Sequence, residues 1–255
     1  MLLAGKTGVI FGVANKRSIA HACAMAASRA GAKLVLTYQN ERLAAGVGKL
    51  ADGMPGEVDI VPCDVTDDAS IDQAVASIGE LMPRVDFVIH SVAFARREEL
   101  EGSFRETTRE GWREAMDVSA FSLAAVSRGL APLMTEGGSI VTMSYLGADR
   151  VLPHYNVMGP AKAALEASVR YLASGLGGDD IRVNAVSAGP LRTLAASGIA
   201  GFNQILDVAA ERSPLKRNAT QDDVADATVF LVSDMSRSVT GTTMFVDCGF
   251  HIMAL

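Results

Sequence analysis

The chain has 255 residues, 49% of them hydrophobic, and is therefore long enough to bury the core of one large α/β domain. Its formal net charge is −6, and its 23 Lys and Arg residues are scattered, which excludes a nucleic-acid-binding surface because such a surface needs clustered cations. No apolar run approaches the roughly 20 residues of a membrane span, so no membrane partner is expected.

Cysteine usage and the N-terminus indicate where the protein works. The three cysteines, Cys23, Cys63 and Cys248, are odd in number and form no CxxC pair, so they predict neither a disulfide framework nor a zinc site. The N-terminal residues run straight into a strand-like segment, without a long apolar region before a cleavage site. A reducing cytoplasm is the expected compartment.

The first half of the chain alternates short apolar runs with helix-prone segments. The apolar runs predict strands at 7–12, 33–38, 57–62 and 86–90. The segments between them predict helices at 18–30 and 40–50, with Ser18 in the first turn of one and Asn40 as the N-cap of the other. Thr66 is expected to cap a third helix.

The second half continues this alternation. It predicts helices at 111–132, 155–176, 202–211 and 220–233, and strands at 138–144, 181–187 and 242–247. No internal repeat or linker divides the chain. We therefore predict a single α/β domain over residues 1–255, with a doubly wound Rossmann-type fold: a parallel seven-stranded sheet with helices on both faces.

Tyr155 and Lys162 stand seven positions apart at the start of an apolar-periodic run. That spacing predicts two side chains on one helical face, about two turns apart, able to reach the same small ligand. A phenol and an ammonium so placed suggest a proton donor and the charge that tunes it. The alternative from these residues alone is that Tyr155 caps a buried helix and Lys162 is a solvated helix lysine.

The ends of the predicted strands offer candidate nucleotide contacts. The first turn is not a G-x-G-x-x-G fingerprint, but Gly12 lets backbone approach a ligand, and Ser18 and Ile19 open a helix whose free N–H groups can meet a pyrophosphate. Candidates for the rest of a dinucleotide follow the later strands: Gln39, Asp64 and Val65 for the adenosine, and Ser91 and Ala93 near the point where strand order reverses.

These motifs together resemble the short-chain dehydrogenase/reductases, specifically the bacterial NADH-dependent enoyl-acyl-carrier-protein reductases of fatty acid synthesis. The resemblance covers essentially the whole chain. It lies in Gly12-x5-Ser18-Ile19-Ala20, in Tyr145-x9-Tyr155-x6-Lys162, and in residues 187–198 (SAGPLRTLAASG), which are similar to the family's substrate lid. Ordinary short-chain reductases share Tyr-x6-Lys but carry a catalytic serine where this chain has Tyr145.

The resemblance implies that NADH reduces the trans-2 double bond of an enoyl thioester carried on acyl carrier protein, within a homotetramer. It implies a lid around 191–211. No metal is expected, because neither His90 nor His154 has a second ligand at a helical spacing. The resemblance also implies roles for individual residues: Tyr145, Tyr155 and Lys162 in catalysis; Lys162, Leu191 and Thr193 at the cofactor; and Phe94, Ala95, Tyr145, Tyr155, Phe202 and Ile205 at the substrate. His90 and His154 are expected to be structural.

The chain departs from this family in three places. Ala93 stands where glycine is common, Cys248 replaces a glycine of Val-Asp-Gly-Gly, and residues 200–204 (AGFNQ) lack the Lys and Arg that some members carry beside the portal. Two other functions stay open. One is an ordinary short-chain carbonyl reductase or alcohol dehydrogenase, and the other is a non-catalytic dinucleotide-binding protein.

Overall fold

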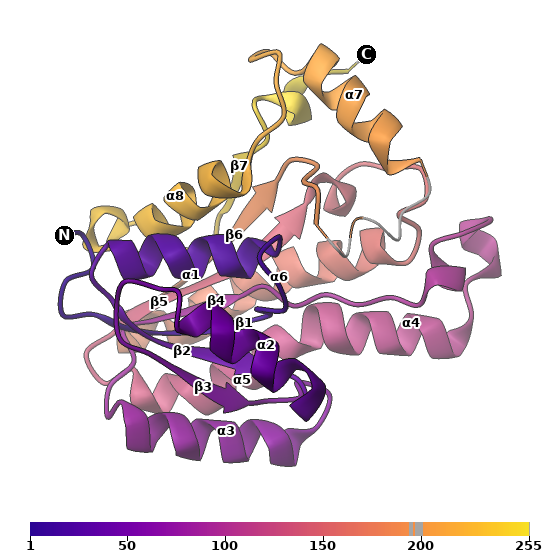
Figure 1. Ribbon diagram of the computed structural model, residues 1–255. Coiled ribbons are helices and arrows are strands. Elements are labelled where there is room, and N and C mark those ends of the chain that lie inside the picture. Colours follow the sequence, from indigo (N-terminus) through magenta and orange to yellow (C-terminus); the bar gives the residue numbers. More distant parts are fainter. Residues whose placement is uncertain (194–195, 197–200, 255) are drawn as a thin grey trace.

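The computed structural model describes residues 1–193, 196 and 201–254. Seven strands form one sheet in the order β3-β2-β1-β4-β5-β6-β7, and every neighbouring pair is parallel (Figure 1). The predicted doubly wound fold is confirmed. The strands are β1 (Thr7–Phe11), β2 (Lys33–Tyr38), β3 (Val58–Pro62), β4 (Phe87–His90), β5 (Gly138–Tyr145), β6 (Ile181–Ala188) and β7 (Thr243–Val246).

Helices cover both faces of this sheet, so each central strand is buried on two sides. One core lies between the sheet and α1, α2 and α8; the other lies between the sheet and α3, α5 and α6. Val9 and Ile10, which are neighbours on β1, point into different cores. The helices are α1 (Ile19–Arg29), α2 (Glu41–Ala51), α3 (Asp68–Leu81), α4 (Arg109–Met116), α5 (Ser122–Leu130), α6 (Met158–Leu176), α7 (Phe202–Arg212) and α8 (Gln221–Val232).

Two predicted helices differ from those observed. The helix expected at 111–132 is divided into α4 and α5 by a π-helical turn, Asp117–Phe121. The helix expected from Tyr155 begins at Met158, because His154 (φ 59°) and Asn156 (φ 35°) adopt left-handed backbone conformations that a right-handed helix cannot contain. Tyr155 therefore lies in the turn before α6, and the prediction that it shares a helical face with Lys162 was wrong.

The helix caps also correct the prediction in detail. Asp67, rather than Thr66, caps α3, since its carboxylate accepts from the N–H of Ala69. Ser18 is the N-cap of α1 rather than a residue of its first turn. Asn40 precedes α2 as expected, but its side chain makes no capping hydrogen bond.

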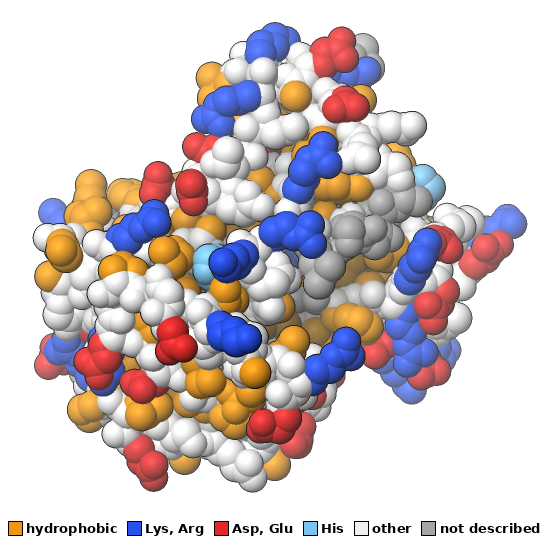
Figure 2. Space-filling model, viewed as in Figure 1, with side chains coloured by type: hydrophobic (Ala, Val, Ile, Leu, Met, Phe, Trp, Pro, Cys, Tyr) orange, Lys and Arg blue, Asp and Glu red, His pale blue; other side chains and the backbone are white. Residues whose placement is uncertain are grey.

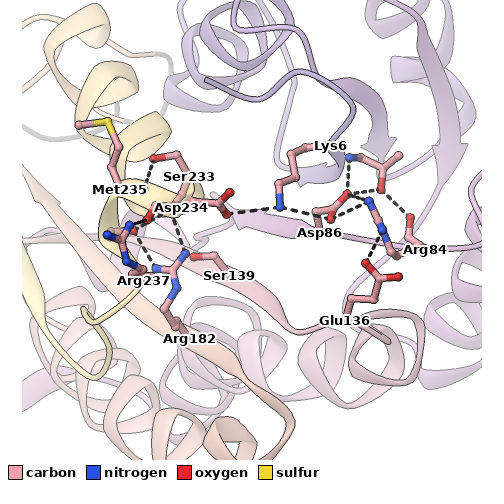
Figure 3. Close-up of polar contacts among 12 residues, drawn as sticks. Lys6, Arg84, Asp86, Glu136, Ser139, Arg182, Ser233, Asp234, Met235 and Arg237 are labelled. Carbon is pink, nitrogen blue, oxygen red and sulfur yellow. Dashed lines mark hydrogen bonds and ion pairs between the residues drawn. The ribbon is translucent and has the colours of Figure 1, made fainter. Parts of the chain in front are cut away.

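Charged side chains tie together the amino ends of the strands (Figure 3). The Asp86 carboxylate accepts from the Thr7 N–H at 2.8 Å and from the Thr7 hydroxyl at 3.1 Å, and Arg84 lies 3.2 Å away. The Lys6 ammonium lies 3.8 Å from Asp86 and 3.4 Å from Asp234, which follows α8. This network fixes the starts of β1 and β4, at the opposite ends of the strands from the candidate site. No helix among the described residues is both long and apolar enough to cross a membrane.

Candidate active site

The carboxyl ends of β1, β2, β4, β5 and β6 open into one cavity of about 900 Å³. Figure 2 shows hydrophobic side chains in the hollow on this face, beside the residues drawn in grey. Asp64 and Ile205 do not line this cavity. Most of the predicted site residues do: Gly12, Ser18, Ile19, Gln39, Val65, Ser91, Ala93, Phe94, Ala95, Tyr145, Tyr155, Lys162, Leu191, Thr193 and Phe202.

The turn after β1 brings backbone to the floor of the cavity. Gly12 has φ +94°, and a Cβ there would lie 2.1 Å from the carbonyl oxygen of Ser91, so only glycine fits. The Ser18 hydroxyl donates to the carbonyl of Asn15 at 2.8 Å and accepts from the N–H of His21 at 3.2 Å. The first turn of α1 thus presents its leading N–H groups to the cavity, where an anion would meet them.

Asp64 orders the turn after β3 from outside the cavity. Its Oδ1 accepts from the Thr66 N–H at 3.0 Å and the Thr66 hydroxyl at 2.8 Å, while its Oδ2 accepts from Gln39 at 3.4 Å. The carboxylate therefore holds the turn after β3 and orients the Gln39 amide, which does line the cavity.

Two tyrosines meet at the inner end of the cavity. The rings of Tyr145, at the end of β5, and Tyr155 lie edge to face with centroids 5.1 Å apart. Burial raises the pKa of Tyr145 to about 12. Burial, and then the neighbouring Tyr145, raise the pKa of Tyr155 further. Both phenols therefore keep their protons at neutral pH and act as hydrogen-bond donors.

Gly147 decides where the Tyr155 ring can lie. A Cβ at Gly147 would be 2.3 Å from Cδ1 of Tyr155, so the ring packs directly against the backbone of this glycine. The side chain of Asn156 donates to the carbonyls of Glu101 and Gly102, both at 3.4 Å, which ties the Tyr155 turn to the loop before α4. The sequence pattern gave no sign of either contact.

Lys162 reaches the same cavity from the first turns of α6. Its side chain is buried, and its ammonium donates to the carbonyl of Met143 at 2.7 Å. Burial lowers the pKa of Lys162 to about 8, and the negative charge of Glu166 opposes that shift. The alternative of a solvated helix lysine is therefore wrong.

His90 lies fully buried at the end of β4 and has a structural role, as predicted for it. Its two ring nitrogens lie 2.9 Å from the hydroxyls of Thr142 and Ser122. Because the Ser122 hydroxyl donates to the carbonyl of Val118 at 2.6 Å, it accepts from Nε2, and Thr142 donates to Nδ1. Burial, followed by the charge of Lys162, lowers the pKa of His90 to about 3, so the ring stays neutral.

The π-helical turn supplies a contact that sequence reasoning missed. The Ser119 hydroxyl accepts from the Phe94 N–H at 2.9 Å and donates to the Phe94 carbonyl at 3.0 Å. It thereby fixes the 91–95 segment, which lines the cavity after β4. The extra residue of a π turn is what aims Ser119 at that backbone.

The predicted lid at 191–211 is described in part. Residues 194–195 and 197–200 lie outside the described chain. Of the rest, Leu191, Thr193 and Phe202 line the large cavity, whereas Ile205 lies on α7 away from it. Arg192 donates to the side chain of Asn203 at 2.8 Å, which joins the start of this segment to α7.

Comparison with known proteins decides the family. The family model described as "Enoyl-(Acyl carrier protein) reductase" matches residues 12–251. The chain belongs to this family. It is 51% identical over 253 residues to the Bacillus cereus enoyl-[acyl-carrier-protein] reductase [NADH], covering 99% of each chain. It is 49% identical over 250 residues to the Staphylococcus aureus enzyme named for NADPH, covering 98% of each.

A solved structure agrees with these relatives. The Bacillus cereus enoyl-acyl carrier protein reductase, crystallised with NADP+ and indole naphthyridinone, matches with a TM-score of 0.98 and 51% identity, over 100% of this chain and 99% of that one. The fold described above is therefore also that of this relative.

The cavity of this enoyl-acyl carrier protein reductase fits a nicotinamide dinucleotide. The cavity extends continuously from Gln39 at the β2 end, across the Gly12 turn, to Lys162 and Tyr155. The close approach of Gly12 to β4 and the open first turn of α1 provide the cradle that a pyrophosphate needs. Across residues 1–193, 196 and 201–254, no three His, Cys, Asp or Glu side chains cluster as a metal site would require.

Proposed function

We propose that this protein reduces the trans-2 double bond of enoyl thioesters carried on acyl carrier protein, with NADH as hydride donor, in bacterial fatty acid synthesis. The observation that carries this proposal is the edge-to-face pair of Tyr145, which is partly buried, and Tyr155, which is buried, in the same cavity as Lys162. Its family membership supports the same reaction.

The reaction needs a donor for a developing oxyanion. Bound NADH supplies a hydride, and its addition to the β-carbon leaves negative charge on the thioester oxygen. Tyr155 is the donor we assign to that oxygen, because its raised pKa keeps the proton in place. One preorganised donor of this kind is worth roughly 3 to 4 kcal/mol in the transition state.

Lys162 and Tyr145 complete the machinery. We assign the Lys162 ammonium to the nicotinamide ribose hydroxyls, where it also keeps a positive charge near the oxyanion; its place in the cavity supports this. Tyr145, edge to face with Tyr155, packs against the thioester. The proposed cofactor residues are Gly12, Ser18, Ile19, Gln39, Val65, Ser91, Ala93, Leu191 and Thr193, with Asp64 acting through Gln39 from outside the cavity. The proposed acyl-side residues are Phe94, Ala95 and Phe202. Ile205 does not line the cavity, so we do not assign it to the acyl side.

Selectivity for NADH follows from the end of β2. Tyr38, Gln39 and Asn40 offer neither a carboxylate to repel a 2′-phosphate nor a cation to pair with it. Arg42, in the first turn of α2, is the cation that would have to reach such a phosphate. Initial rates with the two cofactors test this: a kcat/KM for NADPH equal to or above that for NADH would contradict it.

Assembly and location complete the proposal. The C-terminal segment exposes Phe245, Ile252 and Met253, which supports burial of this segment in a homotetramer. Light scattering at micromolar concentration would detect a monomer and so refute the tetramer. Three free cysteines, Cys23, Cys63 and Cys248, support a reducing cytoplasm.

The decisive experiment follows NADH absorbance with crotonyl thioesters beside a panel of ketones. We expect turnover of the thioesters and little of the ketones. Tyr145→Phe should change thioester reduction modestly, because Tyr145 acts on the substrate side. Efficient ketone reduction that depends on Tyr145, with crotonyl thioesters untouched, would instead establish an ordinary carbonyl reductase. NADH binding without turnover of either would indicate a non-catalytic protein.

A further inference from the structure

Behind Lys162, on the α6 face of the sheet, lies a polar cluster that the reaction above does not use. Ser144 of β5 is buried, and its hydroxyl donates a short hydrogen bond to Oε1 of Glu166 on α6. Glu166 follows Lys162 by four residues, so the two side chains are neighbours on one face of the helix. The carboxylate is thus held from the sheet and lies beside the catalytic lysine.

Ser187 of β6 adds a second hydroxyl to this cluster. It pairs in register with Ser144, and the alternate residues Val183 and Ala185 of its strand pack in the core under α6, so Ser187 faces the same side. It is 1% exposed, and its hydroxyl has no hydrogen-bond partner in the described chain. Two buried hydroxyls from neighbouring strands therefore lie on the sheet face that α6 covers, and one of them holds the Glu166 carboxylate.

The other titratable groups near Lys162 carry no charge at neutral pH. His90 on β4 is neutral because burial lowers its pKa to about 3, and Tyr145 and Tyr155 are neutral because burial raises theirs. The Lys162 ammonium itself donates to a carbonyl, that of Met143. Glu166 is therefore the negative charge, among the described residues, that acts on the ammonium.

We propose that Glu166, held in place by Ser144, is a positioning residue that keeps the Lys162 ammonium charged and directed into the cavity. The inference rests on the proposed function, in which Lys162 holds the cofactor as a cation. Removing the Glu166 charge leaves burial unopposed, so Lys162 loses its proton at a lower pH. Affinity for NADH is then lost at a lower pH as well.

The test is the pH dependence of NADH affinity, measured by fluorescence titration. Glu166→Gln keeps the shape and an acceptor for Ser144 but removes the charge. We expect the pH midpoint for the loss of NADH affinity to move down by about half a unit to one unit. Affinity at pH values well below this midpoint should be unchanged. Ser144→Ala should move the midpoint less, in the same direction, because the carboxylate stays but is no longer held.

Glu136→Gln is the matched control, because it also removes one carboxylate. Glu136 is exposed and pairs with Arg84 near the amino ends of the strands, far from the cavity. Its midpoint should equal that of the wild type. An unshifted midpoint in Glu166→Gln, or an equal loss of affinity at every pH, overturns the inference. If Glu166→Gln does not fold, Ser144→Ala decides: the inference requires a downward shift of its midpoint, and an unshifted midpoint overturns it.

Failure of the proposed function would look different. Wild-type protein that binds NADH but leaves crotonyl thioesters unreduced refutes the reaction, whatever the Glu166 variants do. Wild-type protein that reduces crotonyl thioesters, with a Glu166→Gln midpoint equal to its own, refutes only the role of Glu166.

Discussion

The amino ends and the carboxyl ends of the strands differ in how a buried charge is partnered. At the amino ends, Asp86 is surrounded by donors from Thr7, Arg84 and Lys6 (Figure 3). At the carboxyl ends, Lys162 is 5% exposed and its ammonium donates to a backbone carbonyl. A buried charge with matched partners supports the fold, whereas one without an ion pair is unfavourable unless a ligand binds it. The amino ends of the strands therefore stabilise the chain, whereas the carboxyl ends hold a buried ammonium that a bound ligand would stabilise.

Tyr155→Phe should give the largest effect, because it removes the hydroxyl donor at the carboxyl ends of the strands without disturbing packing. We expect kcat for crotonyl thioesters to fall about 100- to 1000-fold. NADH affinity should stay nearly unchanged, since the hydroxyl acts mainly in the transition state. Tyr171→Phe is the control: Tyr171 lies on α6 and is 82% exposed. Unchanged kcat in Tyr155→Phe would remove Tyr155 from the mechanism.

Lys162→Met should weaken NADH binding as well as turnover. Loss of a charged hydrogen-bond donor is worth about 1.5 to 3 kcal/mol, or roughly 10- to 150-fold in affinity. Fluorescence titration measures the affinity directly. Lys49→Met, which removes an exposed lysine from α2, should bind NADH as the wild type does. Full affinity in Lys162→Met would mean that the cation does not hold the cofactor.

The same lysine predicts a pH dependence of stability with a definite sign. The pKa of Lys162 is about 8 in the folded protein, against 10.5 for a solvated lysine in the unfolded chain, so between these pH values the unfolded chain binds more protons. The wild type should therefore gain stability relative to Lys162→Met as pH rises from 8 to 10.5. Urea unfolding at several pH values measures this difference. A difference that is constant or falls with pH contradicts the lowered pKa.

Asp86→Ala should disturb only the amino ends of the strands. It leaves the Thr7 N–H without its acceptor and removes one of the two carboxylates that pair with Arg84, and we expect the free energy of unfolding to fall by about 1 to 3 kcal/mol. Activity at 25 °C should persist, because the cavity lies at the carboxyl ends of the strands. Glu136→Ala breaks an exposed pair and should change stability by less than about 1 kcal/mol. A large fall in kcat for folded Asp86→Ala protein would show that the amino and carboxyl ends of the strands are coupled.

Gly147→Ala is the finest test, since it moves one ring. The added Cβ would lie 2.3 Å from Tyr155, so the ring must shift, and kcat should fall about tenfold. Gly175→Ala on α6 is the matched control, because a Cβ there has nothing within 4 Å. Equal kcat in the two variants would mean that the position of the Tyr155 ring tolerates the shift.

The sequence alone was sufficient for the sheet and for nominating most of the residues that line the cavity. The central strands of a doubly wound sheet are buried on both faces, so β1, β2 and β4 are continuous apolar runs that local pattern identifies. Tyr145, Tyr155 and Lys162 were found because their spacing resembles a family whose fold places them together. Gly12 was found because a tight turn after the first strand needs a glycine.

Tertiary structure alone decided how those groups are held. The π turn at Asp117–Phe121 serves Ser119, whose partner Phe94 is 25 residues away, and Tyr155 leaves the helix because Asn156 is left-handed. The Ser144 to Glu166 hydrogen bond joins a strand to a helix 22 residues later. Periodicity reports only whether a side chain faces the core or the solvent. Contacts between elements depend on how those elements pack, and no local pattern contains that information.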